Sequence, residues 1–144
     1  MGGRTGRLGS EAPGGAEKGS GMILVNFSGR TVEAAVLPSL AALTGLPVEE
    51  VREVTVSAAL PAAGFQGGIA QLVEAIGCTQ AQLQTEPVVV IPPEASDIAC
   101  GLLAELHGRI GHFPGLLRPT SDAFEVVNLQ QLRSQAMGRR YPVG

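Results

Sequence analysis

Several residue types are scarce in this chain of 144 residues, and each scarcity narrows the classes of protein that it fits. Tryptophan is absent and aromatic residues make up 3% of the chain, so a hydrophobic core must be built from Leu, Val, Ile and Ala. Such side chains are typical of helices packed on a parallel sheet. A chain of this length predicts one core and not two domains.

Positive charge is also scarce. The formal net charge is -3 at pH 7, and the single lysine is Lys18. Broad electrostatic binding to duplex nucleic acid requires many cations that neutralise phosphates and release counterions. We therefore expect no duplex nucleic acid among the partners, and an anionic ligand would have to be held by a few arginines and by helix N-termini.

The two cysteines and the lengths of the apolar runs bear on location. Cys78 and Cys100 lack metal-ligand spacing, and the N-terminus lacks the apolar centre of a secretory signal, so we expect reduced cysteines, no metal site and a cytoplasmic protein. No apolar run approaches the roughly 18 to 20 residues that a membrane span needs. We therefore expect no membrane partner.

Residues 1–21 differ from the rest of the chain in composition. They are rich in Gly, Ser, Ala and charged residues and contain few large aliphatic side chains. Such a segment buries too little apolar surface to offset the entropy of ordering it. The sequence therefore predicts a disordered tail over 1–21, followed by one folded domain over 22–144.

From residue 22 onward the pattern alternates between strand and helix. Apolar runs predict strands at 22–27, 51–56, 87–91, 115–117 and 124–127. Helical periodicity predicts one helix from Thr31 or Pro38 to Gly45 and another that follows residues 64–68 and ends at Gly77. It also predicts helices over 79–83, 95–110 and 128–137. The fold expected from this order is α/β: a single Rossmann-like domain with a mostly parallel sheet, helices on both faces and a terminal antiparallel hairpin.

The turns after the first and third parallel strands are the predicted ligand site. In such sheets a ligand binds beyond the carboxyl ends of the strands where the winding reverses direction. The predicted ligand-binding residues there are Asn26, Phe27, Ser28, Gly29, Pro92, Pro93, Glu94 and Ser96. Amide, hydroxyl and glycine groups suit a nucleotide-type ligand, although a plain turn with a capping serine is an equally good interpretation. There is no GxGxxG and no GK[ST] motif, so we expect neither a dinucleotide cofactor nor nucleoside triphosphate hydrolysis.

Cations near the end of the long helix and after the fourth strand form a second group of candidates. Arg118 follows strand 115–117 on the ligand side, where its guanidinium could hold a phosphate, or it is an exposed hairpin residue. His107, Arg109 and His112 surround the end of helix 95–110, where cations stabilise the helix dipole. They lie away from the predicted crevice, so a subunit contact is the alternative role. No Ser-His-Asp spacing is present, and we assign no catalytic residue.

Three stretches resemble a known family. They are MILVNFSG at 22–29, LLAELHGRIGHFPGLLR at 102–118 and FEVVNLQQLR at 124–133. With them the chain resembles the small CRISPR-associated Csx family numbered fifteen, accessory proteins of type III CRISPR systems. Asn26 and Ser28 match the first-strand motif of that family, and Arg109, His112 and Arg118 match its central block.

The resemblance implies a domain related to the CARF sensors, which bind cyclic oligoadenylates. Family members are thought to bind cyclic tetra-adenylate and to dampen antiviral signalling by sequestration. Phosphates would then be met by Arg118 and the N-terminus of the long helix, and adenines by Phe27 and the prolines. A metal-independent ring nuclease and a protein-interaction module are the alternatives. A two-fold homodimer, alone or in a higher assembly, would present two copies of the crevice to such a ring.

Overall fold

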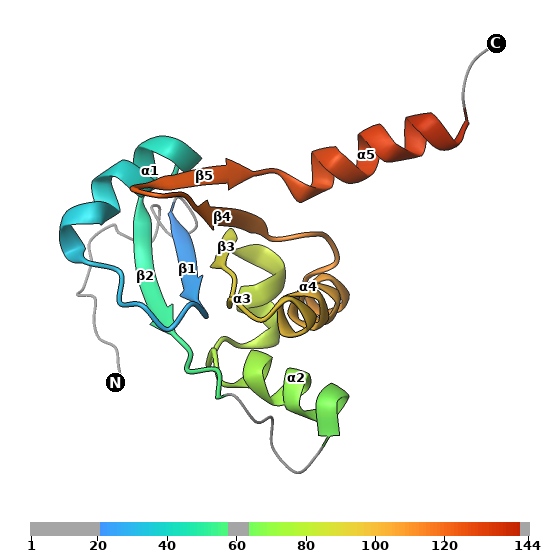
Figure 1. The fold of residues 1–144 in the computed structure, drawn as a ribbon, viewed down its shortest axis with the longest axis horizontal. Helices are drawn as coiled ribbons and strands as arrows, with labels where there is room; N and C mark the ends of the chain where they lie inside the picture. Colours follow the sequence, from blue (N-terminus) through green and yellow to red (C-terminus); the bar gives the residue numbers. More distant parts are fainter. Residues whose placement is uncertain (1–20, 58–63, 142–144) are drawn as a thin grey trace.

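The computed structural model describes residues 21–57 and 64–141 and has an α/β fold built on one five-stranded sheet (Figure 1). The strand order is β2-β1-β3-β4-β5. The strands are β1 (Met22–Asn26), β2 (Val48–Glu53), β3 (Val88–Ile91), β4 (Gly115–Pro119) and β5 (Phe124–Val127). The first four are mutually parallel and β5 runs antiparallel to β4. The predicted α/β class, mostly parallel sheet and terminal hairpin are therefore confirmed. The predicted disordered tail over 1–21 lies outside the described residues except for Gly21, which is buried.

Helices pack on both faces of this sheet, except for the last helix, which projects beyond it. They are the 3-10 turn η2 (Ala34–Val36), α1 (Leu37–Thr44), α2 (Gly64–Glu74), α3 (Gln80–Thr85), α4 (Ser96–Ile110) and α5 (Leu129–Arg140). Side chains of β1 alternate between the faces, as a strand requires. Ile23 and Val25 pack in one core cluster with α2, α3 and α4, whereas Met22 and Leu24 pack in another with Leu40 of α1.

The strand order brings the first and third strands together. β1 lies between β2 and β3, and in the parallel register Asn26 is the partner of Ile91. The connection from β1 to β2 runs through α1 on one face. The connection from β2 to β3 runs through α2 and α3 on the other face and crosses to the far side of β1. The winding therefore reverses between β1 and β3, and the turns after these two strands lie at one edge of the sheet.

On the first half of the domain the structure selects one of two predicted helix starts and corrects one predicted strand. Residues 31–33 are neither helix nor strand, and α1 starts at Leu37, with Pro38 in its first turn. This agrees with the later of the two predicted starts, since proline fits the first turn of a helix. The second strand covers 48–53 and not 51–56, because its pairing with β1 begins at Met22 and Val48.

The glycine-rich stretch at 64–68 was predicted to precede a helix and instead forms its first turn. Gly68 of α2 is buried, and a Cβ on Gly101 of α4 would stand 2.9 Å from the Cδ1 atom of Ile69. The glycine at position 101 therefore allows α2 and α4 to approach closely.

Most helix ends follow the predicted signals. Thr79 accepts from the Gln82 backbone N–H and forms a full capping box, and Asn128 accepts from the Gln131 N–H at the start of α5. Gly111 ends α4 with a φ of 98°, a left-handed value that favours glycine. Ser96 is the first residue of α4, and Ala95 holds the N-cap position without a side-chain hydrogen bond.

The last helix stands apart from the packed body. α5 continues beyond β5 and projects from the rest of the domain (Figure 1). No residue of α5 is buried. Within the described ranges, no helix has the length and apolar character that crossing a bilayer requires.

Candidate functional site

A cavity of about 760 Å³ opens at the sheet edge where β1 and β3 end. Its volume falls in the range of pockets that hold small organic ligands. Three segments form its walls: the chain from the end of β1 through α1, the turn after β3, and the hairpin between β4 and β5. The lining residues are Ser28, Arg30–Glu33, Val36, Ser39, Leu40, Ala42, Leu43, Ile91, Pro92, Glu94 and Pro119–Phe124.

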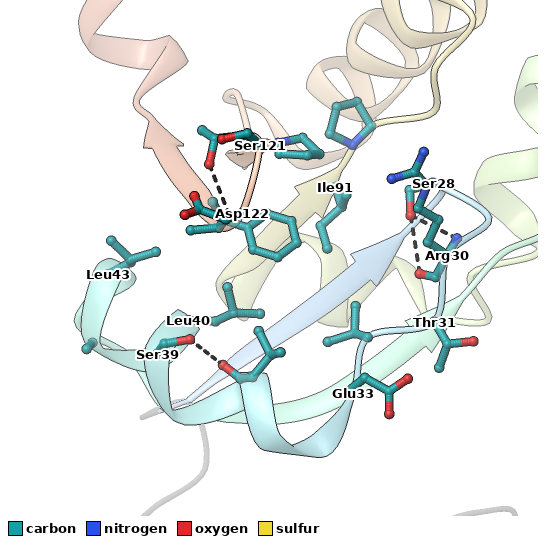
Figure 2. A pocket seen from close by; sticks show the side chains of 18 of the residues that line it. Ser28, Arg30, Thr31, Glu33, Ser39, Leu40, Leu43, Ile91, Ser121 and Asp122 are labelled. Carbon is teal, nitrogen blue, oxygen red and sulfur yellow. Dashed lines mark hydrogen bonds between the residues drawn. The ribbon is translucent and has the colours of Figure 1, made fainter.

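The cavity has an apolar floor and a rim of hydroxyl groups. Leu40 and Ile91 are almost fully buried and belong to the core cluster under α1. Hydroxyl-bearing residues line the cavity from several segments, and Figure 2 shows Thr31 on one side and Ser121 on the other. Such a surface suits a ligand with a flat apolar part and several hydroxyl groups.

The charged residues around the cavity are mostly acidic. Arg30 is the one cation among the described residues that line it, whereas Glu33, Glu94 and Asp122 are carboxylates. Arg30 reaches across from the turn after β1 to the turn after β3, where its Nη2 atom lies 3.4 Å from Glu94 Oε2. Both side chains are about four-fifths exposed, so this pair contributes little to stability and is easily exchanged for a ligand.

Asn26 fixes the conformation of the turn after β1. It is 1% exposed. Its Nδ2 atom donates to the Arg30 carbonyl at 2.6 Å and to Glu53 Oε1 at 3.0 Å, and its Oδ1 atom accepts from the Ser28 N–H and hydroxyl. Glu53 in turn accepts from the Val32 N–H through its other oxygen at 3.3 Å. The wall of the cavity is therefore held by a buried amide and a carboxylate of β2.

Comparison with known proteins identifies no relative. No family model, curated protein or solved structure matches this chain. The site must therefore be interpreted from its own geometry.

Three of the residues predicted to bind ligand line the cavity: Ser28, Pro92 and Glu94. The others occupy different surroundings. Gly29 adopts a φ of 82° and allows the chain to turn after β1, while Pro93 is buried and Ser96 is exposed on the first turn of α4, with neither lining the cavity. The predicted convergence of the two turns is confirmed, although the individual side chains are used differently.

Phe27 and Asn26 do not face a ligand. Phe27 is 1% exposed and packs in the core cluster with α2 and α4, so the prediction that its ring stacks on an adenine is wrong. The reason is strand alternation: Phe27 follows Val25 on the face opposite the cavity. The hydrogen-bonding atoms of Asn26 are taken up by its own chain, so it supports the site without entering it.

Arg118 also faces away from the cavity. Leu117 points into the core cluster under α1, so Arg118 points to the opposite face of β4. Its Nη1 atom lies 2.8 Å from Glu125 Oε1 on β5, and it is not among the lining residues. The predicted phosphate contact is therefore not supported by the geometry, and Arg30 occupies the position that this prediction gave to Arg118.

The histidines and arginine at the end of α4 lie at the other edge of the sheet, as predicted. His107 packs its ring against Phe113, with 4.4 Å between centroids, and His112 Nδ1 lies 3.0 Å from the Phe113 carbonyl oxygen. Arg109 pairs with Glu105 at 2.8 Å and with Glu74 of α2 at 3.6 Å. These contacts join α4 to α2 and to the following loop, which makes the group structural.

Sequence reasoning missed the residues that line most of the cavity. Arg30 was available as a signal because it is the first cation after the first strand. The hairpin residues Thr120–Asp122 gave no signal, since nothing in the sequence tells how far a hairpin reaches over a neighbouring helix.

The described residues near the cavity give little support for a catalytic nucleophile or a bound metal ion. Among residues 21–57 and 64–141, no three His, Cys, Asp or Glu side chains gather to form a metal site. Cys78 packs against the core cluster on the face away from the cavity. Burial raises the pKa of its thiol, outweighing the opposite effect of Arg52, so the reactive thiolate is disfavoured.

Proposed function

We propose that this protein binds a cyclic oligoadenylate, with cyclic tetra-adenylate as the preferred ring, and acts in type III CRISPR defence by sequestering the messenger. The observation that carries the proposal is the cavity at the point where the winding reverses between β1 and β3. This is where nucleotides bind in open α/β sheets with the strand order 2-1-3-4-5. The mostly parallel α/β sheet and the resemblance of three stretches to the Csx family support the same ligand.

In this proposal each part of a nucleotide meets a matching surface. An adenine ring lies on the apolar side chains of Leu43, Pro92 and Phe124, which line the cavity and are at least partly exposed. Ribose hydroxyls meet the hydroxyl rim. A phosphate displaces Glu94 from the Arg30 guanidinium and approaches the first-turn N–H groups of α4, which begins at the same sheet edge.

The charge of the ring requires a second subunit. Among the described residues that line one cavity Arg30 is the one cation, and it cannot by itself neutralise a ring of four phosphates. In a homodimer the partner subunit supplies further cations to each cavity.

Isothermal titration with purified protein and cyclic tetra-adenylate tests the proposal. We expect saturable binding at micromolar or lower concentration and recovery of intact ring by chromatography. Linear tetra-adenylate and cyclic hexa-adenylate are the matched ligands, and both should bind at least ten-fold more weakly. Recovery of a linear product would replace sequestration by ring cleavage, and absence of binding to every adenylate would refute the proposal.

A further inference from the structure

Among the described residues, no part of the chain covers a side chain of α5 enough to bury it. Its 12 residues span about 18 Å and none is buried. Leu132 is 53% exposed and Met137 37% exposed. An isolated helix of this length is marginal in water, and most helical stability in proteins comes from packing. The helix therefore requires a partner surface.

The strand that leads into α5 is an edge strand suited to self-association. β5 pairs with β4 on one side, and no further strand of the described chain pairs with its other side. Val126 is 40% exposed, and the one charge on β5, Glu125, is paired with Arg118. An exposed apolar edge of this kind is a template for pairing with another chain.

The opposite edge is a poor site for the same contact. The edge strand β2 carries the three carboxylates Glu49, Glu50 and Glu53 and one arginine, Arg52, a net charge of −2. A two-fold pair of β2 strands would bring two strands of the same negative charge together, which costs free energy. Self-association through β5 is therefore favoured over β2.

We propose that two copies of this chain pair antiparallel through β5, so that α5 of each subunit lies over the cavity edge of the other. The topology dictates this placement. β5 starts at the hairpin that lines the cavity and runs to the other edge of the sheet, where α5 continues beyond it (Figure 1). In an antiparallel pair the end of one β5 adjoins the start of the other. The α5 helix of the partner therefore extends past the 119–124 hairpin.

Charge complementarity supports this arrangement. α5 carries Arg133, Arg139 and Arg140 and no acidic residue. The cavity that it approaches is lined by the carboxylates Glu33, Glu94 and Asp122, of which Asp122 lies in the hairpin (Figure 2). On the proposed function, Arg133 of the partner subunit also supplies the positive charge for phosphates that a single cavity lacks.

The mass of the protein in solution tests the interface independently of any ligand. Sedimentation equilibrium should give a dimer, and Val126→Lys should raise the dimer dissociation constant at least ten-fold, because the substitution places a lysine against its own copy. Glu49→Lys on the β2 edge is the matched control and should leave the dimer intact. A wild-type monomer at 50 µM, or a Val126→Lys protein that folds by circular dichroism and dimerises normally, would overturn the proposal.

Crosslinking tests the position of α5. In a Cys78→Ala, Cys100→Ser background, Asp122→Cys protein mixed with Ser134→Cys protein should give a heterodimer with a short bis-maleimide. The pair Glu49→Cys and Ser134→Cys should give none. A dimer that forms the second crosslink and not the first would refute the placement of the helix.

Subunit mixing tests the shared site. Arg30→Ala protein and an Arg133→Ala, Arg139→Ala, Arg140→Ala protein should each bind cyclic tetra-adenylate at least ten-fold more weakly. Mixed and refolded together, they should regain about a quarter of the wild-type capacity, because half of the dimers are mixed and each has one intact site. No recovery would refute the shared site. If wild-type protein binds no adenylate, mass and crosslinking still decide the interface.

Discussion

The polar residues at the two edges of the sheet differ in how firmly their own chain holds them. At the end of α4, each candidate residue contacts its own chain: His107 packs on Phe113 and Arg109 pairs with two glutamates. At the edge where β1 and β3 end, exposed groups surround a cavity, and Arg30 is held by one solvent-exposed pair. The histidines and arginine at the end of α4 therefore stabilise the fold. The exposed groups at the cavity edge are the ones that a ligand can reach.

The largest effect that we predict is a loss of folding stability when Asn26, which holds the turn at the cavity edge, is replaced. Asn26→Leu removes the groups that hold the Arg30 carbonyl, the Ser28 N–H and hydroxyl, and the exposed Glu53 carboxylate. We expect a loss of about 3 kcal/mol in urea denaturation, since four hydrogen bonds are lost and each contributes roughly 0.5–1.5 kcal/mol. Asn128→Ala, which removes an exposed helix cap, should cost about 1 kcal/mol. Equal losses would show that the turn does not depend on this amide.

The next effect is on affinity. Arg30→Ala should weaken binding of cyclic tetra-adenylate about ten-fold, or about 1.4 kcal/mol, with unchanged thermal stability. Arg118→Ala is the matched control, because both arginines are exposed and each has one acidic partner. Titration calorimetry should find its affinity unchanged. A larger loss with Arg118→Ala would restore the phosphate role predicted from the sequence.

Arg109→Ala should show the reverse pattern. Its guanidinium is about three-quarters buried and joins α4 to Glu74 of α2. We expect a loss of about 1 kcal/mol of folding free energy and no change in affinity. Thermal denaturation and ligand titration of one preparation measure the stability and the affinity separately. A loss of affinity without a loss of stability would contradict the difference between the two edges of the sheet.

The smallest effect should be a gain. Glu94→Gln releases Arg30 from its carboxylate partner and removes one negative charge from the cavity. Because an exposed pair contributes about 0.2–1 kcal/mol, anion binding should tighten about 1.4- to five-fold. Glu125→Gln, which frees Arg118 on the other face, should have no effect. Weaker binding in Glu94→Gln would indicate that the carboxylate itself contacts the ligand.

Sequence patterns that depend only on neighbouring residues predicted the fold well. Alternating apolar runs identified five strands, and caps such as Thr79 and Gly111 placed helix ends, because these signals depend on a few neighbouring residues. Patterns also located the cavity edge, since parallel strands share a carboxyl end. They failed for Phe27 and Arg118, because the face of the sheet on which each side chain lies depends on the residue at which its strand starts. They also missed the hairpin residues such as Asp122, whose reach over α1 is a tertiary property.

The network around Asn26 has a thermodynamic consequence for recognition. Because the turn after β1 is ordered when the chain folds, a ligand that arrives there does not have to immobilise the backbone of residues 28–32. The entropy cost of ordering this turn is therefore part of the free energy of folding and not of the free energy of ligand binding. Amide hydrogens of this turn should therefore exchange slowly in the free protein, and the ligand should slow them little further.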